Sequence, residues 1–134
     1  MKSTNMIFKK IRTFVCRKKE TVRSNVNDVI TDFAEAWNRL DTELIIKHLD
    51  PSFQYDSQWV YSPQDYNGYI EYIRGKFQAI EMHRIPVSAE IVDDPYEGGQ
   101  MIRIVQSIDG KDSIVYYRIK INNGKVVKGD LCMF

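Results

Sequence analysis

The sequence predicts an α+β domain in which three helices cover one face of a strongly curved, mixed and mostly antiparallel sheet. Two observations lead to this fold class. Apolar residues recur at helical spacing over residues 25–49 and 68–81, with one strand-like run between these segments. From Pro86 onward the apolar period changes to two, and Gly, Asn and Asp clusters separate four further strands.

Charge divides the 134 residues into a basic arm, residues 1–23, and one domain, residues 24–134. The arm holds eight Lys and Arg against one Glu, so its net charge is +7 and that of the remainder is −6. An acidic domain lacks the clustered positive charge that displaces counterions from nucleic acid, so we expect no nucleic-acid partner.

Three interpretations of the arm are open. Its apolar residues fall at helical spacing among the Lys and Arg, which is compatible with an amphipathic helix. Such a segment is a loosely docked leader, a helix that contacts a membrane or an anionic partner, or a helix packed on its own domain or a partner subunit.

The composition also indicates the cellular location of the protein and whether it binds a metal or cofactor. No apolar run approaches the roughly 20 residues that a membrane span needs. Cys16 and Cys132 show neither metal-ligand spacing nor a disulfide framework. We therefore expect a cytoplasmic protein with reduced thiols, no metal and no cofactor.

The helices follow from apolar stripes and capping residues. The first stripe runs from Val26 to Trp37, with Asn25 and Asp28 as a capping pair. A short second helix over 43–49 follows Asp41 or Thr42, and Pro51 stops it. The third spans 68–81 with Asn67 as its cap. Gly75 inside it costs about 1 kcal/mol relative to Ala, which predicts close packing at that position.

The strand-like run at residues 53–60 places three aromatic side chains around one hydroxyl. A period of two puts Phe53, Tyr55, Ser57 and Trp59 on one face, like the wall of a pocket. The remaining strands are expected over 87–93, 101–108, 113–121 and 125–133. The turns between them fall at 94–99, 109–110 and 122–124.

Several segments resemble the NTF2-like superfamily, in particular its SnoaL-like and ketosteroid-isomerase-like members. They are residues 33–41, 49–55, 66–68 and 123–126, and the resemblance covers about residues 25–134. It implies a cone formed by a bent sheet around a long helix, with a cavity at its open end. It also implies a homodimer formed through the sheet.

At two of the three positions that correspond to catalytic residues of ketosteroid isomerases, this sequence has a residue that cannot perform the catalytic role. The oxyanion-hole tyrosine falls on Phe33, the aspartate base on Ser57 and the second oxyanion donor on Tyr117. Phe33 has no hydroxyl, and Ser57 is too weak a base near pH 7 without an activating partner. Asp56 replaces the base only if a bulge turns it to the face of Ser57. We therefore do not expect ketosteroid isomerisation.

Parity along the strands, together with the resemblance, gives the candidate site. The expected ligand-binding residues are Phe33, Trp37, Tyr55, Ser57, Trp59, Tyr69, Gln106 and Tyr117. Tyr72 is an alternative to Tyr69 at the rim. Inward polar groups need a partner, a water or a ligand. The catalytic candidates are Tyr117, Ser57, Asp130 and His83.

Three functions remain open from the sequence. The first is binding of a small, largely apolar ligand in the cone, dimerisation through the sheet, or both. The second is a SnoaL-like isomerase, cyclase or hydratase acting on a small cyclic substrate. The third is an interaction module that the basic arm recruits to a membrane or an anionic partner. Aromatics with isolated hydroxyl and amide groups favour the first.

Overall fold

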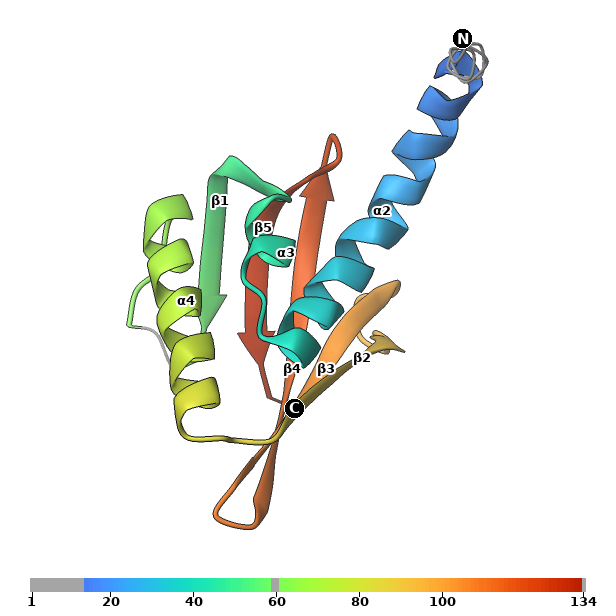
Figure 1. The fold of residues 1–134 in the computed structure, drawn as a ribbon. Coiled ribbons are helices and arrows are strands. Elements are labelled where there is room, and N and C mark those ends of the chain that lie inside the picture. Colours follow the sequence, from blue (N-terminus) through green and yellow to red (C-terminus); the bar gives the residue numbers. More distant parts are fainter. Residues whose placement is uncertain (1–13, 59–60, 134) are drawn as a thin grey trace, which may run out of the picture.

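The structure, a computed structural model, describes residues 14–58 and 61–133 and confirms the predicted fold class (Figure 1). Three helices lie on one side of a five-stranded sheet, α2 (Phe14–Arg39), α3 (Glu43–Ile46) and α4 (Tyr66–Met82). The strands are β1 (Leu49–Ser57), β2 (Val87–Asp93), β3 (Gln100–Ile108), β4 (Lys111–Asn122) and β5 (Lys125–Cys132).

The strand order in the sheet is β1-β5-β4-β3-β2. β1 pairs with β5 in parallel, and the other three pairs are antiparallel, so the sheet is mixed as predicted. In the two tight turns Asp109-Gly110 and Asn123-Gly124, all four residues have positive φ. Such turns twist in the same sense as paired strands, which explains why these dipeptides identified the hairpins.

Helix α2 begins at Phe14, so the expectation that Asn25 caps it is wrong. The segment 14–39 contains neither Gly nor Pro, so nothing in it interrupts a helix. α2 therefore crosses the expected boundary between arm and domain, while residues 1–13 lie outside the described part of the chain. Across the ranges 14–58 and 61–133, no helix has the length and apolarity needed to cross a membrane.

The capping residue of α4 differs from the prediction, and for α3 the side chain of Asp41, one of the two expected residues, accepts the capping bond. Helix α4 begins at Tyr66, and the Asp65 carboxylate, rather than Asn67, accepts a hydrogen bond from the Gly68 N–H at 2.9 Å. The Asp41 side chain accepts from the Glu43 N–H at 3.1 Å. Gly75 lies on the exposed side of α4, and a Cβ added there would have no neighbouring atom within 4 Å, so the expected close packing is wrong.

Strand β1 starts at Leu49, four residues earlier than expected, and contains Pro51. Its register with β5 shifts between Leu49, opposite Val126, and Gln54, opposite Lys128. Proline has no N–H to donate, and it is tolerated in this irregular stretch of an edge strand. The strand continues regularly to Ser57, which brings Tyr55 and Ser57 into the buried interior.

The core lies between the sheet and the helices. Helix α4 packs on β1, and α2 packs on β2 and β3. A group of rings fills the β1 side of this core, and we call it the closed half: Phe33, Phe53, Tyr55, Tyr69 and Tyr117. Each of them is at least 98% buried. The side chains around Tyr55 that were expected to form a pocket wall are therefore mostly packed in the core.

Candidate functional site

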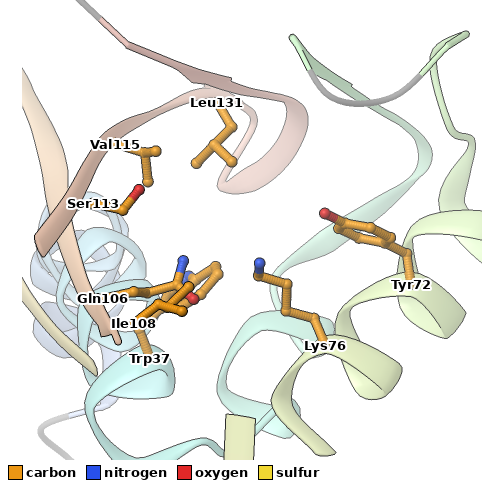
Figure 2. A pocket seen from close by; sticks show the side chains of 8 residues that line it. All are labelled: Trp37, Tyr72, Lys76, Gln106, Ile108, Ser113, Val115 and Leu131. Atoms are coloured by element: carbon orange, nitrogen blue, oxygen red, sulfur yellow. The ribbon is translucent and has the colours of Figure 1, made fainter. Parts of the chain in front are cut away.

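A cavity of about 210 Å³ lies beside the closed half, between helix α4 and strands β3, β4 and β5 (Figure 2). Helix α2 contributes one lining residue and α4 two, and the three strands contribute the rest. The lining residues are Trp37, Tyr72, Lys76, Gln106, Ile108, Ser113, Val115 and Leu131. We refer to this space as the cavity.

The inner part of the cavity is largely apolar. Trp37, Val115, Leu131 and Gln106 are all buried, and the Gln106 amide and the Trp37 indole N–H are the polar groups among them. At the mouth, Ile108 is 47% exposed, and the remaining lining side chains are half-buried. A ligand would place an apolar body inside and polar groups toward the mouth.

Lys76 brings a positive charge to the cavity wall. It follows Tyr72 by four residues, so both side chains leave the same face of α4 and point into the cavity (Figure 2). Burial lowers the pKa of the Lys76 ammonium below its ordinary value. Within residues 27–58 and 61–133, whose side chains the structure describes, no carboxylate pairs with this ammonium, and the lining contains no Asp or Glu.

Two polar groups of the lining lack protein partners. The indole Nε1 of Trp37 is buried without a hydrogen-bond acceptor in the described chain. The side-chain amide of Gln106 likewise makes no hydrogen bond to the described residues, although this residue is only 8% exposed. Unmet hydrogen-bonding capacity of this kind costs free energy unless a water or a ligand satisfies it.

The closed half satisfies its own polar groups instead. The Tyr117 hydroxyl donates to the Tyr69 hydroxyl at 2.8 Å. Phe33 contacts Tyr117 edge-on, with ring centroids 5.9 Å apart, and Tyr55 lies 4.6 Å from Tyr69 by the same measure. Burial raises the pKa of Tyr69, Tyr117 and Tyr55, so these phenols stay protonated. The Tyr117 donor is therefore used internally.

Ser57 and Asp56 occupy opposite faces at the end of β1. Ser57 is buried and hydrogen-bonds to Tyr55, and it is not among the lining residues of the cavity. Asp56 is half-buried, and its carboxylate accepts the Ser57 N–H at 3.0 Å. The position where a catalytic base would stand in the resembling enzymes thus carries an engaged hydroxyl.

The structure distributes the predicted site residues among several places. Trp37 and Gln106 line the cavity. Five others, Phe33, Tyr55, Ser57, Tyr69 and Tyr117, are buried in or beside the closed half. Trp59 lies outside the described residues.

The other two catalytic candidates lie away from the cavity. We call the sheet face opposite the helices the outer face. Asp130 lies on it, because side chains alternate along β5 and the flanking positions 129 and 131 are buried. His83 is an exposed residue at the C-terminal end of α4. Neither residue belongs to the cavity lining.

The sequence reasoning missed Lys76, although its position carried a signal. Residues 73, 76, 77 and 80 form the i, i+3, i+4, i+7 pattern of a buried helix face. Ile73, Phe77 and Ile80 are buried as that pattern predicts, and Lys76 breaks the pattern with a charge. A lysine on an otherwise apolar stripe marks either the border of the buried helix face or a cavity that contains polar groups. Lys76 lines the cavity.

A second hollow of about 280 Å³ lies on the outer face and is lined by Glu97, Arg118, Ile119, Lys120, Lys128 and Asp130. Arg118 forms two hydrogen bonds to Asp94, at 2.5 and 3.1 Å, and contacts Glu97 at 3.3 Å. The Arg118 guanidinium holds the pKa of Asp94 well below its usual range. Charges of both signs thus compensate one another in this hollow.

In the described part of the chain, no three His, Cys, Asp or Glu side chains gather into a group that could hold a metal ion. Cys132 is a free, half-buried cysteine, and burial raises the pKa of its thiol. A raised pKa keeps a thiol protonated, so Cys132 lacks the character of a reactive nucleophile.

Comparison with solved structures identifies an NTF2-like fold. One similar structure is an NTF2-like protein of unknown function from Burkholderia pseudomallei, with a TM-score of 0.60 and 15% identity over 83% of this chain and 92% of that one. Another is a proposed polyketide cyclase from Sinorhizobium meliloti, with a TM-score of 0.58 and 15% identity, covering 78% and 93%.

A third similar structure is a hypothetical protein from Catenulispora acidiphila with a ketosteroid isomerase-like fold, in complex with trimethylamine. Its TM-score is 0.56, and it is 16% identical over 79% of this chain and 85% of that one. No protein-family model matches the sequence, and no curated protein matches it. At these identities the likeness establishes the fold, and the chain has the NTF2-like fold.

Proposed function

We propose that this protein is an NTF2-like domain that binds a small molecule with an apolar ring-sized body in the cavity. The observation that carries the proposal is the unpartnered Gln106 amide within a buried wall formed by Trp37, Val115 and Leu131. A packed core would close such a space or satisfy its amide. An aliphatic and aromatic wall with few polar groups is the usual composition of a small-molecule site.

The volume limits the size of the ligand. An apolar cavity of about 150 Å³ holds benzene, and this cavity measures about 210 Å³. It therefore accommodates one ring with a short substituent. A four-ring steroid is several times larger than benzene and exceeds the volume of this cavity. Size thus agrees with Phe33 and Ser57 in disfavouring a steroid substrate.

The arrangement of polar groups supports binding over acid–base catalysis. Proton transfer needs a base and an acid that converge on one substrate. Here the hydroxyls of Ser57 and Tyr117 are engaged in the closed half, while Asp130 and His83 lie away from the cavity. Among its solved neighbours, one is a proposed cyclase and one holds trimethylamine, so the fold itself does not decide between the two roles.

Tryptophan fluorescence tests the proposal. The chain has two tryptophans, so Trp59→Phe leaves Trp37 in the cavity wall as the single reporter. We expect phenylacetamide and phenylacetate, as small ring probes, to change Trp37 emission saturably. Val115→Phe should fill the cavity and remove this response.

Val92→Phe is the matched control, because Val92 is half-buried on β2, lies opposite Met101 on β3 and does not line the cavity. Its response should equal that of the parent protein. Absence of saturable binding in the parent, or an unchanged response in Val115→Phe, would contradict the proposal.

We also propose that the outer face forms a homodimer. Val105 lies opposite Ile114, and Arg103 lies opposite Tyr116, so three apolar or aromatic side chains adjoin one another on β3 and β4. All three are half-buried, and the helices lie on the other side of the sheet. Light scattering should show a dimer for the parent and a monomer for Ile114→Lys. A monomeric parent would rule out this association.

A further inference from the structure

We propose that the ligand of the cavity is a small organic acid, with an apolar ring inside the cavity and a carboxylate held by Lys76. This inference rests on the proposed ligand-binding function and adds the chemical class of the ligand. Three features of the described residues carry it: the charge of the lining, the lack of a partner for Lys76, and the donors around it.

The lining carries a single formal charge, which is positive. Of the eight side chains, only Lys76 is ionised at neutral pH, and no carboxylate lines the same space. The contrast with Arg74 on the same helix is informative, because Arg74 projects to solvent and pairs with Glu43 at 3.3 Å. Within the described ranges, Lys76 pairs with no such acid and points into the cavity (Figure 2).

An anion would offset the cost of placing Lys76 at this site. A partly buried ammonium loses hydration, and a carboxylate oxygen restores a charge-assisted hydrogen bond. The interaction is stronger in a cavity shielded from water than at an exposed surface. A neutral ligand would leave the ammonium without a counter-charge, and a cationic ligand would be repelled.

The neighbouring polar groups can all donate hydrogen bonds. Tyr72 and Ser113 carry hydroxyls, and the Gln106 amide carries two N–H donors. In Figure 2 the Tyr72 hydroxyl and the Lys76 ammonium approach the same space from α4, opposite Ser113 on β4. A carboxylate accepts several hydrogen bonds at once, so this set of donors suits it better than it suits an ammonium or a hydrocarbon.

Three matched probes test the inference: phenylacetate, phenylacetamide and phenethylamine share one ring and a similar length but differ in charge. Binding to the full chain is measured by calorimetry and by NMR titration. We expect phenylacetate to bind about tenfold more tightly than phenylacetamide, the difference of one charge-assisted hydrogen bond. Phenethylamine should bind most weakly.

Two variants locate the charge responsible. Lys76→Met keeps the length and apolar stem of the side chain, and it should bind phenylacetate and phenylacetamide equally. Lys120→Met makes the same substitution at an exposed lysine in the hollow on the outer face, and it should keep the parent's tenfold preference. A folded Lys76→Met protein is verified by its unfolding transition.

The outcomes separate this inference from the proposed function. If the parent binds none of the probes, both fail. If the parent binds phenylacetamide as tightly as phenylacetate, or if Lys76→Met keeps the preference, the acid is ruled out while ligand binding stands. Loss of the preference in Lys120→Met alone would move the anion to the outer face and overturn the inference.

Discussion

The two halves of the cone interior differ in how they treat buried polar groups. In the closed half the Tyr117 and Tyr69 hydroxyls satisfy each other at 2.8 Å among packed rings. In the cavity, a few residues away on the same elements, Lys76 and the Gln106 amide find no partner in the described chain. The difference separates a packed core, whose hydroxyls are hydrogen-bonded, from an open cavity whose Lys76 ammonium and Gln106 amide have no partner in the described chain.

The same contrast applies to the positions that the ketosteroid isomerases resembled by this sequence use for catalysis. Phe33, Ser57 and Tyr117 all belong to or adjoin the closed half, where rings fill the space that a substrate would need. The open space lies instead beside Tyr72 and Lys76, further along α4. The same fold thus keeps a cavity while it fills the usual reaction centre.

The largest expected effect comes from disturbing the closed half at Gly129. A Cβ at this position would lie 2.5 Å from the Tyr117 hydroxyl oxygen and 3.0 Å from two ring carbons. Because Tyr117 is fully packed, we expect Gly129→Ala to lower the free energy of unfolding by about 3 kcal/mol, measured by urea denaturation. Combining it with Tyr117→Phe should cost less than the sum of the single changes, and strict additivity would refute the clash.

A second change separates the two halves by their hydroxyls. Tyr117→Phe leaves the buried Tyr69 hydroxyl without its donor, so we expect a loss of about 2 kcal/mol in the free energy of unfolding. Ser113→Ala, which removes a half-buried hydroxyl from the cavity lining, should stay within about 0.5 kcal/mol of the parent. Equal losses in the two variants would show that the halves do not differ in this way.

A third change is on α4, the helix that contributes residues to both the closed half and the cavity. The substituted residue itself belongs to neither. Gly75 is exposed on α4 with free space around it. Gly75→Ala should therefore raise the free energy of unfolding by up to about 1 kcal/mol, because alanine restricts the unfolded chain and favours helix. Binding of phenylacetate should not change. A destabilised variant would mean that α4 is packed more closely there than the structure shows.

The smallest effect concerns the pH dependence that Lys76 contributes. Its pKa is lowered in the folded protein, so between that value and the ordinary 10.5 the unfolded chain binds more protons. The penalty for burying the charge is fully present below the folded pKa and disappears as the pH rises toward 10.5. Lys76→Met should therefore melt at a higher temperature than the parent at pH 7, and the gap should narrow toward pH 10. A gap independent of pH would indicate that Lys76 is fully hydrated.

The local features of this chain were predictable because they depend on near neighbours. The Asp109-Gly110 and Asn123-Gly124 turns follow from the need for positive φ in tight hairpins. Strand β2 begins and ends where the period of two predicts, at Val87 and Asp93. The capping of α4 was misplaced by two residues because Asp65 and Asn67 both have suitable side chains, and only the direction of the entering chain selects one.

By itself the sequence determined the fold class, the hairpins and the apolar faces of the helices and strands, since periodicity and turn chemistry encode these directly. Its resemblance to ketosteroid isomerases also predicted that Phe33 and Ser57 stand at two of the catalytic positions of those enzymes. Only the tertiary structure decided where the interior is filled and where it is open, because packing depends on side chains far apart in sequence. Tyr69 meets Tyr117 across 48 positions, and Lys76 faces Gln106 and Ser113 only once α4 lies against the sheet.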